Sequence, residues 1–184
     1  MLIVRLHNAA FEAIQRLLED WLLASFARLI FAGVLFVYFW RSAMTKLGDG
    51  LAGLIHLSPG AYAQILPRQM EAVSYDPSQL DILSHIIVYA GTYAEIVLPI
   101  LLVAGLFTRL AALGMIGFIA VMTWTDITQH GVDAATIGAW FDKDPASPIA
   151  DQRSLWAFLL LVLALKGPGP FSLDALLGRM RGYR

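Results

Sequence analysis

The segment Trp21–Trp40, WLLASFARLIFAGVLFVYFW, decides the fold, because it is an almost unbroken apolar run with one charged residue, Arg28. A helix of about 20 residues, rising 1.5 Å per residue, crosses the roughly 30 Å hydrocarbon core of a bilayer. A lone guanidinium in hydrocarbon costs about 2.5 kcal/mol or more, so we expect the chain to supply a partner for it. The segment therefore predicts a membrane-spanning helix with an internal polar contact.

The composition of the whole chain also favours a membrane protein. Hydrophobic residues make up 58% of the 184 residues and charged residues 15%, against about 25% charged residues in soluble domains. The net charge of −1 provides no electrostatic footprint for a nucleic acid, so no partner of that class is expected. Because the chain has no cysteine, disulfides, thiolate metal sites and CxxC redox pairs are excluded. Electron chemistry would need a bound cofactor or another subunit.

Apolar segments along the chain predict one membrane domain that covers residues 1–184. The expected order is an interfacial helix over 1–20, spans over 21–44, 82–107, 109–126 and 149–166, outer segments over 45–81 and 127–148, and a tail over 170–184. The fourth span is long enough only if it begins near Ile149, since its purely apolar part covers 155–165. The predicted fold class is therefore all-α: a polytopic four-transmembrane-helix bundle with N- and C-terminal interfacial helices.

The distribution of Lys and Arg predicts the orientation of these spans. One side of the bundle would carry Arg5, Arg16, Arg109, Lys166, Arg179, Arg181 and Arg184. The other side would carry Lys46, Arg68, Lys143 and Arg153. Because positive residues concentrate in cytoplasmic segments, we expect both termini in the cytoplasm and the two acidic outer segments on the opposite side of the membrane.

Arg28, Arg41 and Glu95 form the first group of candidate site residues, because all three fall within predicted spans. Glu95 lies near the middle of the second span, and Gly91, one turn earlier, leaves space for an approaching side chain. We therefore expect Arg28 and Glu95 to form an ion pair inside the lipid. Two interpretations remain open: a structural salt bridge that fixes helix register, or a proton relay or polar anchor for a ligand headgroup.

His85, Tyr89 and Tyr93 form the second group, at spacing i, i+4 and i+8 on one face of the second span. Such a stripe could hydrogen-bond a quinone carbonyl. An interfacial histidine with aromatic belt residues explains the same pattern, and this interpretation is favoured.

Thr123, Asp126 and His130 cluster at the outer end of the third span. With His85 nearby, Asp126 and His130 are candidate ligands for a divalent metal. Three candidate ligands without a fixed spacing do not define a metal site, so solvated interface residues are the favoured interpretation. The sequence also lacks a glycine-rich phosphate loop, an HExxH pair and a G-x-S-x-G elbow, and we do not expect an enzyme that acts on its own.

Four strings in a fixed order resemble the DoxX family of small bacterial membrane proteins. They are RSAMTKL at 41–47, AEIVLP at 94–99, GLFTRLAAL at 105–113 and KGPGPFSLD at 166–174. The chain departs from the family pattern at Ala43, where a glycine is expected, and in the length of both outer segments.

The resemblance implies a four-helix protein of the bacterial inner membrane that belongs to a membrane complex. DoxX-like proteins are associated with quinone-linked sulfur oxidation, oxidative-stress complexes and metal-related peptide maturation. The resemblance marks Arg28, Lys46, Glu95 and Arg109 as family-matching positions without assigning a reaction to them.

Three functional hypotheses follow for this lipid-embedded chain. The first is an integral membrane subunit or accessory component of a redox-linked, quinone-contacting or metal-related system, with protein partners in a membrane complex. The second is a small carrier for protons or a polar solute, with Glu95 as the titrating group and Arg28 as its counter-ion. A carrier would need a homo-oligomer, because four spans make a thin wall for a pore. The third is a purely structural membrane scaffold.

Overall fold

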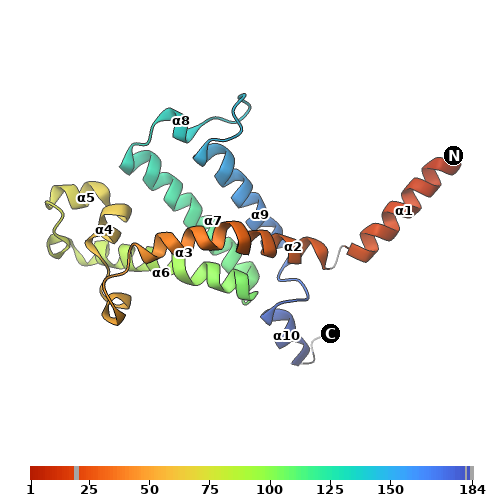
Figure 1. Cartoon of the computed structure of the whole chain (residues 1–184), viewed down its shortest axis with the longest axis horizontal. Helices are drawn as coiled ribbons and strands as arrows, with labels where there is room; N and C mark the ends of the chain where they lie inside the picture. Colours follow the sequence, from red (N-terminus) through yellow and green to blue (C-terminus); the bar gives the residue numbers. More distant parts are fainter. Residues whose placement is uncertain (19–20, 181, 183–184) are drawn as a thin grey trace.

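The computed structural model of the chain describes residues 1–18, 21–180 and 182. Within these ranges the chain is helical, without a β-strand, and Figure 1 shows the helices as one bundle with extensions at its ends. Positions 19–20 of the expected N-terminal helix, and Arg181 and Arg184 of the orientation count, lie outside the described residues.

Four helical segments are long and apolar enough to cross a membrane: Leu22–Met44, Ile82–Ala104, Thr108–His130 and Pro148–Lys166. The predicted all-α, polytopic fold class is therefore confirmed.

The four spans are built from the following helices. The first span joins α2 (Leu22–Ile30), the π-helical segment η1 (Phe31–Phe36) and α3 (Val37–Met44). The second is α6 (Ile82–Ala104), and the third joins α7 (Thr108–Thr125) to the π-helical segment η4 (Asp126–His130). The fourth joins the π-helical segment η5 (Pro148–Gln152) to α9 (Arg153–Lys166). Pro99 lies inside α6 and lacks a backbone N–H. A membrane helix accommodates such a proline because neighbouring helices can satisfy the carbonyl that is left without a donor.

The bundle has two distinct ends. The first and the last described helices, α1 (Leu2–Leu18) and α10 (Leu173–Met180), lie at one end, the terminal end, as an even number of crossings requires (Figure 1). The opposite end, the loop end, carries the short helices that connect the spans. They are η2 (Leu51–Leu54), α4 (Pro59–Ile65), α5 (Pro67–Ala72), η3 (Pro77–Gln79) and α8 (Ala134–Ile137).

The spans surround a core of large side chains. Helix α2 packs against α9, α3 packs against α6, and α7 packs against both α6 and α9. Phe39 is fully buried, and its ring meets those of Phe118 and Trp156 edge to face at 6.0 and 6.1 Å. Because lipid tails are as apolar as these side chains, the core stabilises the bundle through close packing rather than through removal of apolar surface from water.

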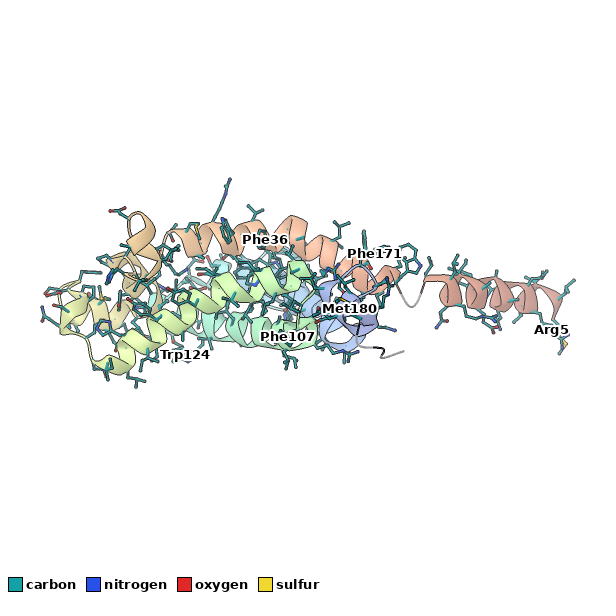
Figure 2. All side chains as sticks on the ribbon, turned by 90° about the horizontal axis from the view of Figure 1, so that it is seen from below. Arg5, Phe36, Phe107, Trp124, Phe171 and Met180 are labelled. Atoms are coloured by element: carbon teal, nitrogen blue, oxygen red, sulfur yellow. The ribbon has the colours of Figure 1, made fainter. Side chains whose placement is uncertain are left out.

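The outer surfaces of the spans are apolar and exposed. Trp124 and Phe107, labelled in Figure 2, lie on the outside of the bundle with exposed fractions of 58% and 62%. Helix α1 projects beyond the bundle and has no buried residue (Figures 1 and 2). Lipid contact of the spans follows from this surface, whereas a position of α1 on the membrane surface stays a prediction.

The second outer segment is less helical than the sequence suggests. A helix is expected over 134–141, with Asp133 as its N-cap, and Asp133 does accept a hydrogen bond from the Thr136 amide at 2.7 Å. The helix nevertheless ends at Ile137, because Gly138 adopts φ +69° and turns the chain out of the helix.

Candidate functional site

A cavity of about 560 Å³ lies in the loop-end half of the bundle, between α3, α6 and α7. Its volume is in the range of small-molecule sites. The lining residues on α6 are Ile87, Ala90, Gly91, Ala94 and Glu95, and those on α7 include Gly114, Gly117, Phe118, Val121 and Met122. The spacing of these positions at three and four residues places each set on one helix face, so the two faces are turned toward each other.

Small residues on the facing sides of α6 and α7 leave this space open. A Cβ atom built on Gly117 would meet no atom within 4 Å, so this part of α7 faces empty space. Gly114 differs, because its Cβ would lie 3.1 Å from Leu98 Cδ2. Leu98 of α6 therefore packs onto α7 at Gly114 and closes the cavity on the side of the terminal end.

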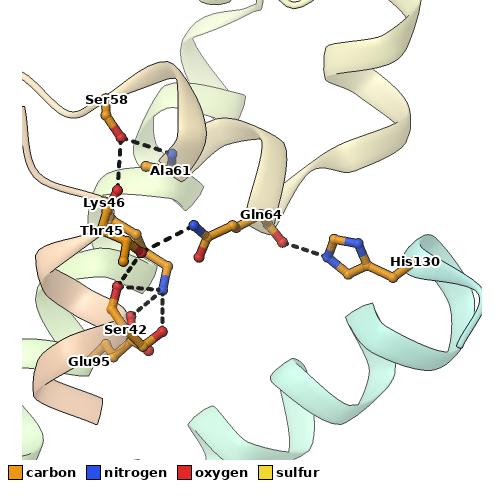
Figure 3. A network of polar contacts seen from close by, with 8 residues as sticks. All are labelled: Ser42, Thr45, Lys46, Ser58, Ala61, Gln64, Glu95 and His130. Carbon is orange, nitrogen blue, oxygen red and sulfur yellow. Dashed lines mark hydrogen bonds and ion pairs between the residues drawn. The ribbon is translucent and has the colours of Figure 1, made fainter. Parts of the chain in front are cut away.

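A buried ion pair forms the back of the cavity. Lys46 follows α3 and extends its ammonium to Glu95 of α6, with an Nζ–Oε2 distance of 2.5 Å (Figure 3). The two side chains are only 8% and 3% exposed. Lys46 Nζ also donates to Ser42 Oγ at 2.9 Å, one helical turn earlier. The carboxylate and the ammonium thus neutralise each other in an apolar environment, which neither could occupy alone at low cost.

The expected ion pair between Arg28 and Glu95 is not formed, so this prediction is wrong. Arg28 lies nearer the terminal end, where its Nη1 donates to the Pro168 carbonyl at 2.6 Å and its Nη2 to the Phe171 carbonyl. These carbonyls belong to a non-helical segment that needs donors, and they accept hydrogen bonds from the guanidinium. The carboxylate of Asp174 is close enough to interact electrostatically with Arg28. Lys46 reaches Glu95 from the loop end instead.

Arg41 contacts neither Arg28 nor Glu95. Its side chain is exposed and borders a shallow groove beside Val37 and Thr45. Within the described part of the chain it forms no ion pair. The structure therefore separates Arg28, Arg41 and Glu95, which the sequence placed in one group.

The terminal end is held by a contact between two of the strings on which the DoxX resemblance rests. Asp174 accepts hydrogen bonds from the amides of Phe107 and Thr108 at 2.9 and 3.0 Å and from Thr108 Oγ1 at 3.0 Å. Its own amide donates to Gly105 O at 2.9 Å. Gly105 has φ +67°, and a Cβ there would lie 2.4 Å from Arg28 Nη1. We call Arg28, Gly105, Thr108 and Asp174 the terminal clamp.

Arg109, which belongs to the string GLFTRLAAL at 105–113, packs elsewhere at the terminal end. A Cβ on Gly167 would come within 3.2 Å of its Nε, so its guanidinium packs against the end of α9. This family-matching residue therefore belongs to the terminal end and not to the cavity.

A hydrogen-bonded bridge covers the cavity at the loop end. Gln64 of α4 donates from Nε2 to Thr45 Oγ1 at 3.2 Å, and its backbone carbonyl accepts from His130 Nε2 at 2.9 Å (Figure 3). Since a carbonyl only accepts, His130 carries a proton on Nε2. Gln64 and the neighbouring Ile65 line the cavity. Helix α4 thus connects the ends of α3 and η4 above the ion pair.

The His85, Tyr89 and Tyr93 stripe lies outside the cavity, on the opposite side of α6. Tyr89 donates to the Ile55 carbonyl at 2.7 Å, and Tyr93 donates to the Leu54 carbonyl. His85 Nδ1 lies 2.8 Å from the hydroxyl of Tyr62. These three residues therefore attach the first outer segment to α6. They do not line the cavity, so a quinone bound in the cavity would not contact them.

The hydroxyl of Tyr62, which contacts His85, is a neutral phenol. Burial, with the nearby Tyr89, raises the pKa of Tyr62, so its hydroxyl keeps its proton throughout the physiological range.

The candidate metal ligands are not brought together. The carboxylate of Asp126 pairs with the Arg153 guanidinium, which also donates to Thr123 Oγ1 at 2.8 Å. His130 bonds the Gln64 carbonyl and His85 contacts Tyr62. Among the described residues, no group of three His, Cys, Asp or Glu side chains could hold a metal ion. The carboxylate of Asp126 is instead occupied by its ion pair with Arg153.

Sequence reasoning did not identify the contacts of three residues that shape these sites: Lys46, Asp174 and Arg153. The resemblance marks Lys46 only as a family-matching position, and hydropathy places it in the outer segment that follows the first predicted span. A signal was present, because Ser42 and Lys46 at i and i+4 share one helix face that continues into the lipid. The partner of Asp174 lies 66 residues away from it, and no local pattern identifies such a contact.

Comparisons with known proteins agree with this architecture. A sequence model of the DoxX family matches residues 23–127, which is more than half of the chain. The match covers the first three spans apart from residues 22 and 128–130, and every cavity-lining residue except His130. No curated protein and no solved structure matches the chain significantly. The family match, together with four spans in the expected order, shows that the chain belongs to the DoxX family.

Proposed function

We propose that this DoxX protein is an integral membrane subunit of a redox-linked system and that it contacts a quinone in the cavity between α3, α6 and α7. The observation that carries the proposal is an apolar cavity, inside the spans, with a buried hydrogen-bond donor at its back. A quinone head is apolar, uncharged and has two carbonyl acceptors. Its chemistry therefore matches a mostly apolar lining whose charged side chains are each paired with an opposite charge.

Two donors are available to a quinone carbonyl. The ammonium of Lys46 has three N–H groups, of which one serves Glu95, one serves Ser42 Oγ, and one makes a long contact of 3.5 Å to the Ser42 carbonyl that a ligand acceptor can replace. The hydroxyl of Tyr38 also lines the cavity and has no hydrogen-bond partner within the described residues. A head bound next to α3 would accept hydrogen bonds from these two groups, which both lie on the α3 side of the cavity.

The first test measures quinone binding to the purified protein in nanodiscs, with Tyr38→Phe as the variant and Tyr89→Phe as its matched control. Both variants remove one hydroxyl, but only Tyr38 lines the cavity. Loss of a hydrogen bond worth about 0.5–1.5 kcal/mol predicts roughly 2- to 10-fold weaker binding for Tyr38→Phe alone. Equal affinities of the two variants would exclude this cavity as the quinone site.

The second test concerns the complex. The protein should be extracted from its native membrane in a mild detergent, and bound quinone and co-purifying proteins should be identified. We expect a redox protein partner in a stoichiometric complex. A monomer without quinone and without a partner contradicts the proposal.

A carrier for protons or a polar solute is a second candidate, because Glu95 lies near the middle of α6 and lines the cavity. Lys46, not Arg28, is then the counter-ion. Proton flux in proteoliposomes should fall to background in Glu95→Gln if the carrier proposal holds. Flux that is unchanged in this variant excludes Glu95 as the titrating group.

We also propose that the terminal end faces the cytoplasm of a bacterium and that the chain resides in the inner membrane, as the Lys and Arg distribution indicates. The sequence has no cysteine, so a single cysteine can report its own location. In Asn8→Cys, labelling of the cysteine by a membrane-impermeant maleimide should require permeabilised cells. With one at Ala146, at the loop end, labelling should occur without permeabilising the inner membrane. The reverse pattern overturns the orientation.

A further inference from the structure

We infer that the cavity is entered sideways from the lipid, through a gap between α6 and α7, and that its ligand is a neutral amphiphile whose apolar tail stays in this gap. The lateral gap is defined by Ile87 and Ala90 of α6 and by Gly117 and Val121 of α7. This inference deepens the proposed function, since it names the ligand class and route of the same site.

The position of the lateral gap follows from the faces of the two helices. On α6 the cavity face lies between the core face, with Glu95 and Leu102, and the lipid face, with Val97. On α7 the cavity face likewise lies between the core face, with Met115, and the outer face, with Trp124. The side of the cavity away from the core therefore opens onto lipid.

Exposure of the rim agrees with an opening at this place. Val121 is 64% exposed and Ile87 is 42% exposed, although both line the cavity. Ala90 and Gly117 are also exposed and contribute little or no side chain. The rim is thus apolar, exposed and lined in part by residues with little or no side chain.

The other sides of the cavity are closed by contacts already described. Gln64 and His130 bridge the loop end, and Leu98 packs onto Gly114 toward the terminal end. Helix α3, with Lys46 bound to Glu95, forms the back. A water-soluble ligand would have to break the loop-end bridge, whereas a ligand dissolved in the membrane meets no hydrogen bond in the lateral gap.

Charge restricts the head of this ligand. Lys46 is neutralised by Glu95, and Asp126, which also lines the cavity, is neutralised by Arg153. A charged head would enter a low-dielectric site without a free counter-ion, which is unfavourable. The head is therefore neutral and offers hydrogen-bond acceptors to Lys46 or Tyr38. Both a long-tailed quinone and a diacylglycerol have this chemistry.

The test uses two probes, a long-tailed quinone and a diacylglycerol, each with a photoreactive group in its tail. After illumination in nanodiscs, peptide mapping locates the cross-links. We expect a saturable cross-link of the quinone probe at Ile87 or Val121. Saturable cross-links at Gln64 or His130 instead would show a route through the loop end and overturn the inference, while quinone binding itself would still stand.

A variant pair controls for general lipid contact. Gly117→Leu places a side chain into the lateral gap, where a Cβ meets no atom within 4 Å. Ala120→Leu introduces the same residue type at an exposed α7 position that does not line the cavity. Cross-linking at the gap should fall at least 10-fold in Gly117→Leu and less than 2-fold in Ala120→Leu. Equal yields in the two variants contradict the route.

The two probes separate the route from the proposed quinone function. Saturable gap labelling by the diacylglycerol alone supports lateral access by a neutral amphiphile and refutes the quinone. Labelling by neither probe refutes the lateral gap as a ligand route. A third outcome is that a quinone without a tail binds as tightly as the long-tailed quinone. That result would keep the proposed quinone function but refute a binding site for the tail in the lateral gap.

Discussion

Replacing Asp174 with alanine should destabilise the bundle by about 2–3 kcal/mol. Its carboxylate accepts from two backbone amides and one hydroxyl at the start of α7, and Thr108 is only 1% exposed. Loss of a helix cap costs about 0.5–2 kcal/mol, and a buried donor left without a partner costs about 1–3 kcal/mol. Because these contributions overlap, their full sum is not expected.

Equilibrium unfolding in detergent, followed by tryptophan fluorescence, measures this loss, and hydrogen exchange locates it. The Thr108 amide should lose protection in Asp174→Ala. Asp174→Asn keeps one carbonyl oxygen as an acceptor and should lose about half as much stability. Asp133→Ala is the control, because Asp133 caps only the four-residue helix α8. A change below about 0.5 kcal/mol in Asp174→Ala, with an unchanged Thr108 amide, would refute the terminal clamp.

Three further predictions concern single positions. Gly117→Ala should stabilise the protein by up to about 1 kcal/mol in thermal unfolding, because its Cβ meets open space within a helix. Gly53→Ala should destabilise it by about 1–3 kcal/mol in the same assay, because its Cβ would lie 1.9 Å from a backbone oxygen across the loop. Hydrogen bonds from Gln79 and Ser78 hold the pKa of Asp76 below its usual value of 3.8, so Asp76 stabilises its turn above that pH. Exchange of the Ser78 amide should therefore be slow at neutral pH and accelerate, beyond its intrinsic pH dependence, as the pH falls below about 3.8 through the lowered pKa.

The sequence was sufficient for the architecture because membrane spans are encoded locally. An apolar run of about 20 residues has one low-energy arrangement in lipid, and the hydropathy of 22–44 and 82–104 is visible without any tertiary contact. The same locality explains the Asp133 cap, whose acceptor and donor lie three residues apart.

The choice of partners for the buried charges could not be predicted in this way. Two cations, Arg28 and Lys46, were available to Glu95, and the outcome depends on carbonyls about 140 residues from Arg28 in sequence. Hydropathy placed Lys46 in the outer segment over 45–81 because it follows the first span, although its side chain extends back into the bundle.

The cavity was also invisible from the sequence alone. Ala111, Gly114 and Gly117 predict a small-residue face for close packing. Gly114 does pack against Leu98, but Gly117, three residues later, faces open space. Whether a glycine marks a contact or a void depends on the side chain opposite, which single-sequence patterns do not provide.

The central claim, that Glu95 is neutralised by Lys46 and not by Arg28, is tested most directly by two double-mutant cycles. Stability is measured for Lys46→Met, Arg28→Leu and Glu95→Gln, and for the two doubles that include Glu95→Gln. Both partners of the Lys46 pair are more than nine-tenths buried, so their coupling should be about 2–3 kcal/mol. The Arg28 and Glu95 substitutions should add within about 0.5 kcal/mol. A coupling above 2 kcal/mol between Arg28 and Glu95, with none between Lys46 and Glu95, would contradict the account.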